Sequence, residues 1–307
     1  MILRQRQPVL PLPSPARLRV PPHALAYGAF AVAGALWGTS FLLGKVALAE
    51  VGAPTIITYR FILASVVLLP LALMRQTVRL TRRDWRDLAL AALLMGPFMF
   101  WLQFEGLART TASSAALLVG IGPPLLAIGA LIVDGERPGR RTWIAIALSV
   151  IGTLVLVGAP AGGRTVLGDL MVVVSMGAAV GWTLVSRRLA RRLGVLTATA
   201  FQFSIGALLL APLALAADGV PALTLSQPVW GAILAMGLGC TALTFYLWNW
   251  GLMRAKAAKA GVFANLEPVV GAGLGVLVLG EVLAPAGLAG GALVLGAALL
   301  VTTEAHA

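Results

Sequence analysis

The sequence is poor in the residue types that enzymes use for metal and nucleophilic chemistry. It contains one cysteine, Cys240, and two histidines, His23 and His306, which stand near its opposite ends. A single cysteine forms neither a disulfide framework nor a thiolate metal cluster. There is also no Gly-x4-Gly-Lys-Ser/Thr motif for binding nucleotide phosphates. The sequence therefore predicts no metal, no cofactor and no catalytic residue.

Charge is equally scarce. Charged residues make up 11% of the chain, hydrophobic residues 59%, and the mean hydropathy is +0.94, whereas soluble domains carry about 25% charged residues. This composition predicts an integral protein of the lipid bilayer. The net charge of +12 does not indicate nucleic acid, because the basic residues fall in short tracts between apolar runs, as in cytoplasmic loops.

Apolar runs of membrane-spanning length recur along the chain. We place them at residues 24–47, 54–74, 87–106, 111–133, 142–159, 168–186, 196–216, 229–251, 257–279 and 285–303. Some are short or interrupted by glycine and proline, so nine spans is the alternative count. The repeat described below favours ten.

The basic residues predict the orientation. With the N-terminus in the cytoplasm, almost all loop arginines and lysines fall on the inner side, and the outer loops hold only Arg109 and Arg164. This bias favours cytoplasmic N- and C-termini in a plasma membrane, the inner membrane of a bacterium. Residues 1–23 lack a continuous apolar signal core and are expected to be a disordered cytoplasmic tail. Residues 304–307 form a second cytoplasmic tail.

The chain repeats itself. Gly106-Leu107-Ala108-Arg109 matches Gly251-Leu252-Met253-Arg254 at an offset of 145, and the same offset carries Gly135-Glu136 onto Gly280-Glu281. Two units follow, residues 24–159 and 168–303, joined by a linker at 160–167. Because each unit has five spans, the second enters the membrane from the opposite side. The expected fold is all-α, with ten transmembrane helices in two inverted five-helix repeats around a central cavity.

Two interrupted helices correspond between the repeats. The ninth run contains Asn265, Glu267 and Pro268, and the carboxylate lies about ten residues in, roughly 15 Å deep. The fourth run carries the glycines and prolines of the matching break, which are Gly120, Gly122, Pro123 and Pro124. Paired breaks of this kind predict a gate beside a transport site. The alternative is a packed kink with a neutral carboxyl group.

Other polar and aromatic residues are candidates for binding a solute. Arg60 on the second span corresponds to Gln202 in the other half, and its planar group suits a carboxylate or phosphate. Arg60 could instead extend to the membrane surface or pair with Glu50 or Glu105. Tyr59 is a binding candidate or an interfacial aromatic residue. The remaining candidates for lining the path are repeat-related pairs and their neighbours, with helix packing as the alternative: Trp37 with Trp182, Trp101 with Tyr246, and Asn249.

These motifs resemble a known family. Trp37-Gly38-Thr39-Ser40-Phe41, Tyr59-Arg60-Phe61, Tyr246 to Leu252 and Asn265 to Pro268 are similar, in that order, to EamA-type members of the drug/metabolite transporter superfamily. The resemblance covers about residues 26–303. It implies ten helices in two inverted repeats and the export of small metabolites such as amino acids, or of drug-like compounds. One departure is that Gly122-Pro123 stands where the second half has Glu267-Pro268.

The sequence thus predicts a secondary transporter that exports amino acids or related small metabolites by alternating access. Glu267 is the candidate group for coupling to protons or solute. A nucleotide-sugar or lipid-linked metabolite carrier is the alternative, although only Arg60 and Lys45 could supply its basic cavity. An intramembrane enzyme is a remote alternative. The solute, the coupling ion and the oligomeric state do not follow from the sequence.

Overall fold

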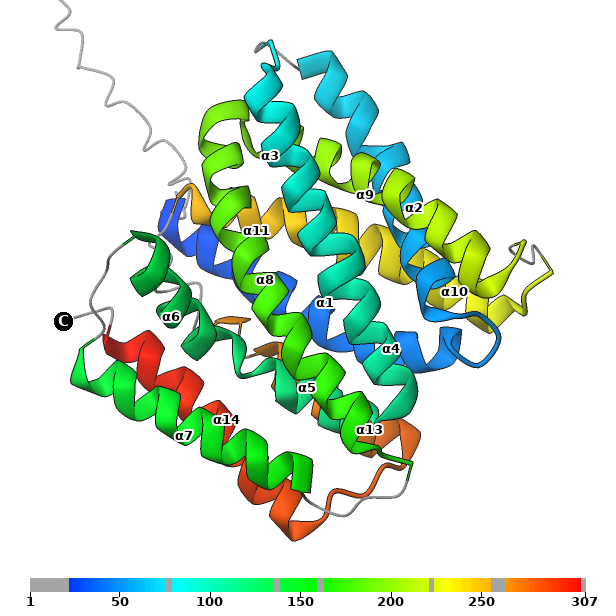
Figure 1. Ribbon diagram of the computed structural model, residues 1–307. Coiled ribbons are helices and arrows are strands. Elements are labelled where there is room, and N and C mark those ends of the chain that lie inside the picture. The colour runs from blue at the N-terminus through cyan, green and yellow to red at the C-terminus, as the bar shows by residue number, and fades with distance from the viewer. Residues whose placement is uncertain are drawn as a thin grey trace, which may run out of the picture.

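All regular structure in the described residues is helical (Figure 1). The computed structural model describes residues 22–75, 79–134, 139–158, 163–220, 224–254, 263–264 and 266–304. Its helices in the first half are α1 (Pro22–Ala47), α2 (Ala53–Arg75), α3 (Arg82–Leu93), the π-helix η1 (Leu94–Trp101), α4 (Leu102–Arg109), α5 (Ala112–Val119), α6 (Gly122–Asp134) and α7 (Arg140–Gly158). Those in the second half are α8 (Val166–Leu193), α9 (Val195–Asp218), α10 (Gln227–Leu234), the π-helix η2 (Ala235–Leu243), α11 (Thr244–Leu252), α13 (Leu266–Leu279) and α14 (Pro285–Glu304).

In the part of the chain that the structure describes, six helical stretches are long and apolar enough to cross a membrane, which supports the prediction of an integral membrane protein. They are Leu25–Ala47, Ala53–Arg75, Arg82–Arg109, Val166–Leu193, Val195–Asp218 and Gln227–Gly251. The other predicted runs contain shorter apolar helices: Ala112–Leu126, Trp143–Val155, Leu266–Leu279 and Pro285–Ala297. The count of ten spans stays a prediction.

Large apolar side chains cover the outside of the helices. Leu208 of α9 is 75% exposed, Leu154 of α7 67% and Val66 of α2 66%. All three lie inside their helices and not at a helix end. A water-soluble protein rarely exposes contiguous apolar surface of this kind. The exposed apolar side chains therefore indicate the lipid-facing surface.

Local signals set several helix boundaries. Thr81 and Asp84 form a capping box at the start of α3, in which each side chain accepts a hydrogen bond from the other residue's backbone N–H. Gly194 separates α8 from α9 with φ of 81°, a conformation that glycine adopts without steric cost. Pro228 lies in the first turn of α10, where a missing N–H leaves no helical hydrogen bond unmade.

Helices from the two halves pack against each other in corresponding pairs. α2 packs on α9, α5 on α13, and α7 on α14. The pair α7 and α14 runs side by side along one edge of the molecule (Figure 1). α1 contacts α11 and α13, while α8 contacts α4 and α6. The centre of the fold is therefore lined by helices of both halves.

Each half contains one π-helical segment in its third span. η1 includes Pro97, which cannot donate a helical hydrogen bond and favours such a distortion. η2 has no proline, and the Thr241 hydroxyl donates to the Met236 carbonyl at 2.8 Å. π-helical turns are frequent at functional sites because they redirect side chains. Both segments face the centre of the molecule through buried residues such as Phe100 and Thr241.

Glycines let α1 and α13 approach closely. A Cβ atom at Gly38 would lie 2.7 Å from the Glu267 carbonyl oxygen and 3.0 Å from the Gly271 nitrogen. A Cβ at Gly271 would lie 2.6 Å from the Cβ of Ala116 on α5. Close approach through small residues is a common way for helices to pack in membranes. The position of Glu267 therefore depends on Gly38.

We expect Gly38→Ala to destabilise the protein, because its methyl group meets backbone atoms that cannot move aside. Overpacking of this kind costs about 1–3 kcal/mol, and the thermal unfolding midpoint in detergent should fall accordingly. Gly273→Ala is the matched control on α13, since a Cβ there would meet nothing within 4 Å. Equal unfolding midpoints for the two variants would show that α1 and α13 do not pack as described.

Candidate functional site

Arg60 is the most deeply buried charged residue of the site. Its exposed fraction is 0%, so the side chain does not extend to the membrane surface. Nε donates a hydrogen bond to Thr241 Oγ1 at 3.1 Å. The guanidinium carbon lies 4.8 Å from the Phe100 ring centroid and 5.1 Å from that of Phe104, a cation–π arrangement. The two terminal nitrogens have no hydrogen-bond partner in the described part of the chain.

The carboxylates that could have paired with Arg60 are engaged elsewhere. Glu105 forms an ion pair with Arg109 one turn along the same helix. Glu50 accepts a hydrogen bond from the Ser226 N–H at 2.9 Å. Arg60 therefore has neither of the two surface partners considered for it.

Phe245 on α11 joins the aromatic residues of the two halves. Its ring centroid lies 5.3 Å from Trp37, 5.2 Å from Trp182 and 5.1 Å from Phe203. It also lies 5.9 Å from the Phe100 ring that Arg60 covers. The two predicted tryptophans, Trp37 and Trp182, thus meet around a phenylalanine. The Trp37 Nε1 is buried without a hydrogen-bond partner among the described residues.

A hydrogen-bonded chain holds Trp182 in place. Trp182 Nε1 donates to Gln202 Oε1 at 2.7 Å, and Gln202 Nε2 donates to Ser186 Oγ at 3.2 Å. All three residues are buried. Gln202 therefore connects α9 to α8, and its side-chain hydrogen bonds go to Trp182 and Ser186.

Glu267 belongs to the same region as Arg60. It lies in the first turn of α13 and its carbonyl oxygen faces Gly38 of α1. The next residue, Thr39, lies 3.4 Å from Cys240 Sγ through its Oγ1 atom, and Cys240 precedes the Thr241 that binds Arg60. The Arg60 guanidinium and the Glu267 carboxylate also attract each other electrostatically. A cation and an acid therefore share one buried region beside aromatic rings.

The remaining predicted binding residues point to separate contacts. The Tyr59 ring centroid lies 5.6 Å from that of Trp230 on α10, with the two rings tilted by 40°. Trp101 Nε1 donates to Glu105 at 3.2 Å, and Asn249 Nδ2 donates to Thr199 Oγ1 at 3.1 Å. Tyr246 is half-buried on α11, and Asn265 lies outside the described residues.

The predicted helix breaks lie at helix ends. Gly120 and Ile121 form the turn between α5 and α6. Gly122, Pro123 and Pro124 begin α6. Pro268 is the third residue of α13, so its missing N–H falls where no helical hydrogen bond is expected.

Sequence reasoning missed three residues that organise the site: Thr241, Cys240 and Phe245. Phe245 is not among the predicted site residues, and the two polar residues lie in an apolar run with no distinguishing signal. Thr241 and Cys240 lie on the π-helical segment η2. The repeat alone could have drawn attention to Phe245, because it corresponds to Phe100.

The arrangement suits binding more than bond chemistry. Aromatic rings offer apolar faces to a solute, Arg60 offers the N–H groups of its two terminal nitrogens, and Glu267 offers an acceptor. Such a site could recognise a small molecule that has both polar and apolar parts.

Comparison with known families agrees with the division of the chain into two halves. The sequence matches the EamA-like transporter family over residues 24–158 and again over residues 166–303. The chain belongs to the EamA-like transporter family. The two matched segments correspond to the two halves described above and leave out the segment between them.

Curated relatives carry transporter names. An uncharacterized transporter of Archaeoglobus fulgidus is 24% identical over 76% of this chain and 82% of its own length. The uncharacterized transporter YetK of Bacillus subtilis is 27% identical over 83% and 80%. The aromatic amino acid exporter YddG of Ancylobacter novellus is 28% identical over 68% and 70%.

A solved crystal structure shares the fold. It covers 92% of this chain and 97% of its own length, with a TM-score of 0.68 and 23% sequence identity. At this identity the likeness establishes the fold alone.

We expect Gln202→Leu to destabilise the protein, because it leaves the buried Trp182 N–H and Ser186 hydroxyl without their partner. An unsatisfied buried donor costs about 1–3 kcal/mol. Thermal unfolding in detergent, followed by tryptophan fluorescence, should show a lower midpoint. Gln227→Leu is the control, since Gln227 is exposed at the start of α10. An unchanged midpoint for Gln202→Leu would mean that this hydrogen-bonded chain is unimportant.

Proposed function

We propose that the protein exports amino acids or related small metabolites across the plasma membrane by alternating access. The observation that carries this proposal is the fully buried Arg60, whose two terminal nitrogens lack hydrogen-bond partners in the described residues. A buried charge costs several kcal/mol unless it is compensated. A solute carboxylate would accept two charge-assisted hydrogen bonds from the guanidinium group.

The aromatic surroundings support a solute with an apolar part. Phe100, Phe104 and Phe245 lie beside or near the Arg60 group, and Trp37 and Trp182 extend this surface across both halves. The relative from Ancylobacter novellus is named an aromatic amino acid exporter. A carboxylate bound to Arg60 and an aromatic or aliphatic side chain against these rings would match that class of solute.

The proposed architecture is ten spans in two inverted repeats. The cross-half packing of α2 on α9, α5 on α13 and α7 on α14 supports it, as does the double family match. The arginines around the start of α3 and the end of α8 support a cytoplasmic location for that end of the molecule. Transport would then require the two halves to rock around the central helices.

Glu267 is the proposed coupling residue. Its carboxylate is electrostatically coupled to Arg60, so binding a proton at Glu267 changes the charge balance that a solute meets. Proton binding to intramembrane carboxylates is a common means of coupling in transporters.

Replacing Arg60 tests the binding role. In reconstituted vesicles, Arg60→Gln should raise the KM for amino acid counterflow by about 10- to 150-fold, because a charge-assisted hydrogen bond contributes about 1.5–3 kcal/mol. Arg75→Gln on the exposed end of α2 is the control. Size-exclusion chromatography in detergent checks that each variant is folded. A folded Arg60→Gln protein with wild-type KM would refute the proposed role.

Replacing Glu267 tests coupling separately. Glu267→Gln keeps the shape of the side chain but cannot exchange a proton, so we expect exchange of labelled amino acid that no longer responds to pH. The measurement is counterflow at several pH values in the same vesicles. Counterflow with the same pH dependence as that of the wild type would rule out Glu267 as the coupling group.

A further inference from the structure

Four carboxylates join the two halves of the protein at one end. We call this end the acidic end, and the ties run between Glu281 and Ala112, Asp218 and Thr55, Asp169 and Thr110, and Glu50 and Ser226. In every tie one residue belongs to the first family match and the other to the second. The four ties come from different loops and helix ends, so together they hold the two halves at this end.

Glu281 makes the most extensive of these ties. Its two carboxylate oxygens accept the backbone N–H groups of Ala112 and Ser113, each at 2.7 Å. These are the first two residues of α5, and Thr111 accepts the next free N–H, that of Ser114, at 3.1 Å. A carboxylate from the second half therefore completes the cap of a helix in the first half, which is favourable at a helix N-terminus.

The surroundings of Glu281 are tightly packed. Gly280 precedes it with φ of 67°, and a Cβ at Gly275 would lie 2.6 Å from the Glu281 carboxylate and 2.3 Å from Ser113 Oγ. Ser113 Oγ also donates to the Ala272 carbonyl of α13 at 3.2 Å. Lys45 near the end of α1 attracts the Glu281 carboxylate electrostatically. Hydrogen bonds thus hold the end of α13 against the start of α5.

Asp218 does the same for α2. Its Oδ2 atom accepts the Thr55 hydroxyl at 2.6 Å and the Thr55 N–H at 3.2 Å, so a residue at the end of α9 caps the first turn of α2. Asp169 is fully buried and accepts the Thr110 hydroxyl at 2.6 Å. Hydrogen bonds from Ser226 lower the pKa of the Glu50 carboxyl below its ordinary value.

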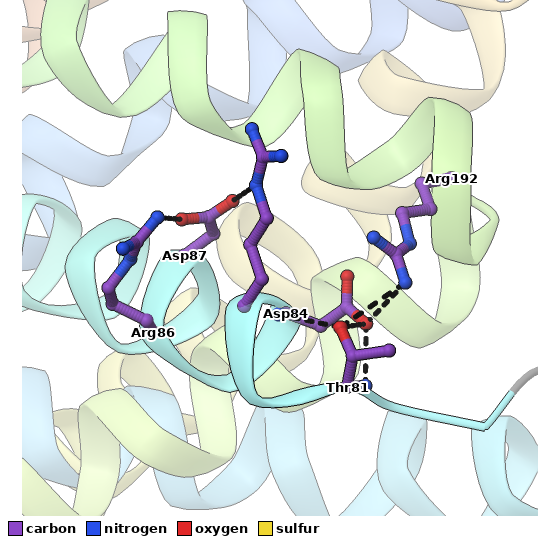
Figure 2. Close-up of polar contacts among 6 residues, drawn as sticks. Thr81, Asp84, Arg86, Asp87 and Arg192 are labelled. Atoms are coloured by element: carbon purple, nitrogen blue, oxygen red, sulfur yellow. Dashed lines mark hydrogen bonds and ion pairs between the residues drawn. The ribbon is translucent and has the colours of Figure 1, made fainter.

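The opposite end has its own tie between the halves. Asp84 at the start of α3 pairs with Arg192 near the end of α8 at 2.9 Å, and Arg192 also donates to Thr81 at 3.3 Å (Figure 2). The span from Arg82 to Arg109 runs from this tie to Thr110 at the acidic end, about 42 Å at 1.5 Å per residue. α8 likewise runs from Asp169 to Arg192. The two sets of ties therefore lie at opposite ends of the same helices.

We infer that these ties are two opposed locks, and that access to the central site from either side requires release of the ties on that side. Releasing Glu281 and Asp218 would let α5 and α2 separate from α13 and α9 at the acidic end. Releasing Arg192 from Asp84 would let α8 separate from α3 at the other end. This inference rests on the proposed alternating access, but its test does not depend on the solute.

Cys240 provides the reporter for the test, because it is the only cysteine in the sequence. It is 1% exposed and lies next to Thr241, the partner of Arg60. The rate at which a membrane-impermeant maleimide labels Cys240 in sealed vesicles of known orientation measures access from one chosen side. No engineered cysteine is needed.

The double variant Glu281→Gln and Asp218→Asn should label at least tenfold faster than the wild type when the reagent is added at the acidic end. Arg192→Gln, which leaves the capping box of Thr81 and Asp84 intact, should label faster only from the opposite side. Glu105→Gln is the control, because within the described residues the hydrogen bonds of the Glu105 side chain stay in its own helical span. It should label at the wild-type rate.

Two results would overturn the inference. The first is an unchanged labelling rate in both lock variants. The second is faster labelling from both sides in either variant, which would mean general loosening and would be accompanied by a lower unfolding midpoint. If the lock variants behave as expected but no amino acid is transported by the wild type, the proposed solute is wrong and the locks stand.

Discussion

A charge buried among helices in a membrane must find its compensation within the protein, because lipid offers none. Arg60 poses this problem at the centre of the fold, where it is fully buried. One hydrogen bond donated to Thr241 of η2 and two aromatic faces compensate it in part, and Glu267 lies within electrostatic range of it. These partners come from η2, η1, α4 and α13. The packing of these segments around α2 at the centre is therefore also the arrangement that makes a buried cation tolerable.

The helices could be predicted closely from the sequence because hydropathy and helix-breaking residues are local signals. The predicted run 54–74 is the helix Ala53–Arg75, and 196–216 is Val195–Asp218. The π-helical segments could not be predicted in the same way. An extra residue in a helical turn changes neither the hydropathy nor the length of a run, so η1 and η2 leave almost no trace in composition.

The candidate site could be predicted in part. Depth in the membrane singled out Arg60, Glu267 and Trp37 as residues that need an explanation. The partners of these residues did not follow, because each partner depends on which helices meet. Glu281 shows the difference: in the sequence it is only the repeat counterpart of Glu136, and the first residues of the helix that it caps, α5, lie 168 and 169 positions away. Only the packing of α13 on α5 brings the two together.

The π-helical segments have a consequence for how side chains are aligned between relatives. One extra residue in a helical turn rotates the residues that follow it by about 100° about the helix axis. η2 precedes Phe245, so it is this extra residue that aims the ring between Trp37 and Trp182. A relative without the extra residue in this segment would present a different side of α11 to the centre. This would hold even if the rest of the two sequences aligned without a gap. Insertions and deletions of a single residue inside a membrane span can therefore alter the lining of a transport path while leaving the topology unchanged.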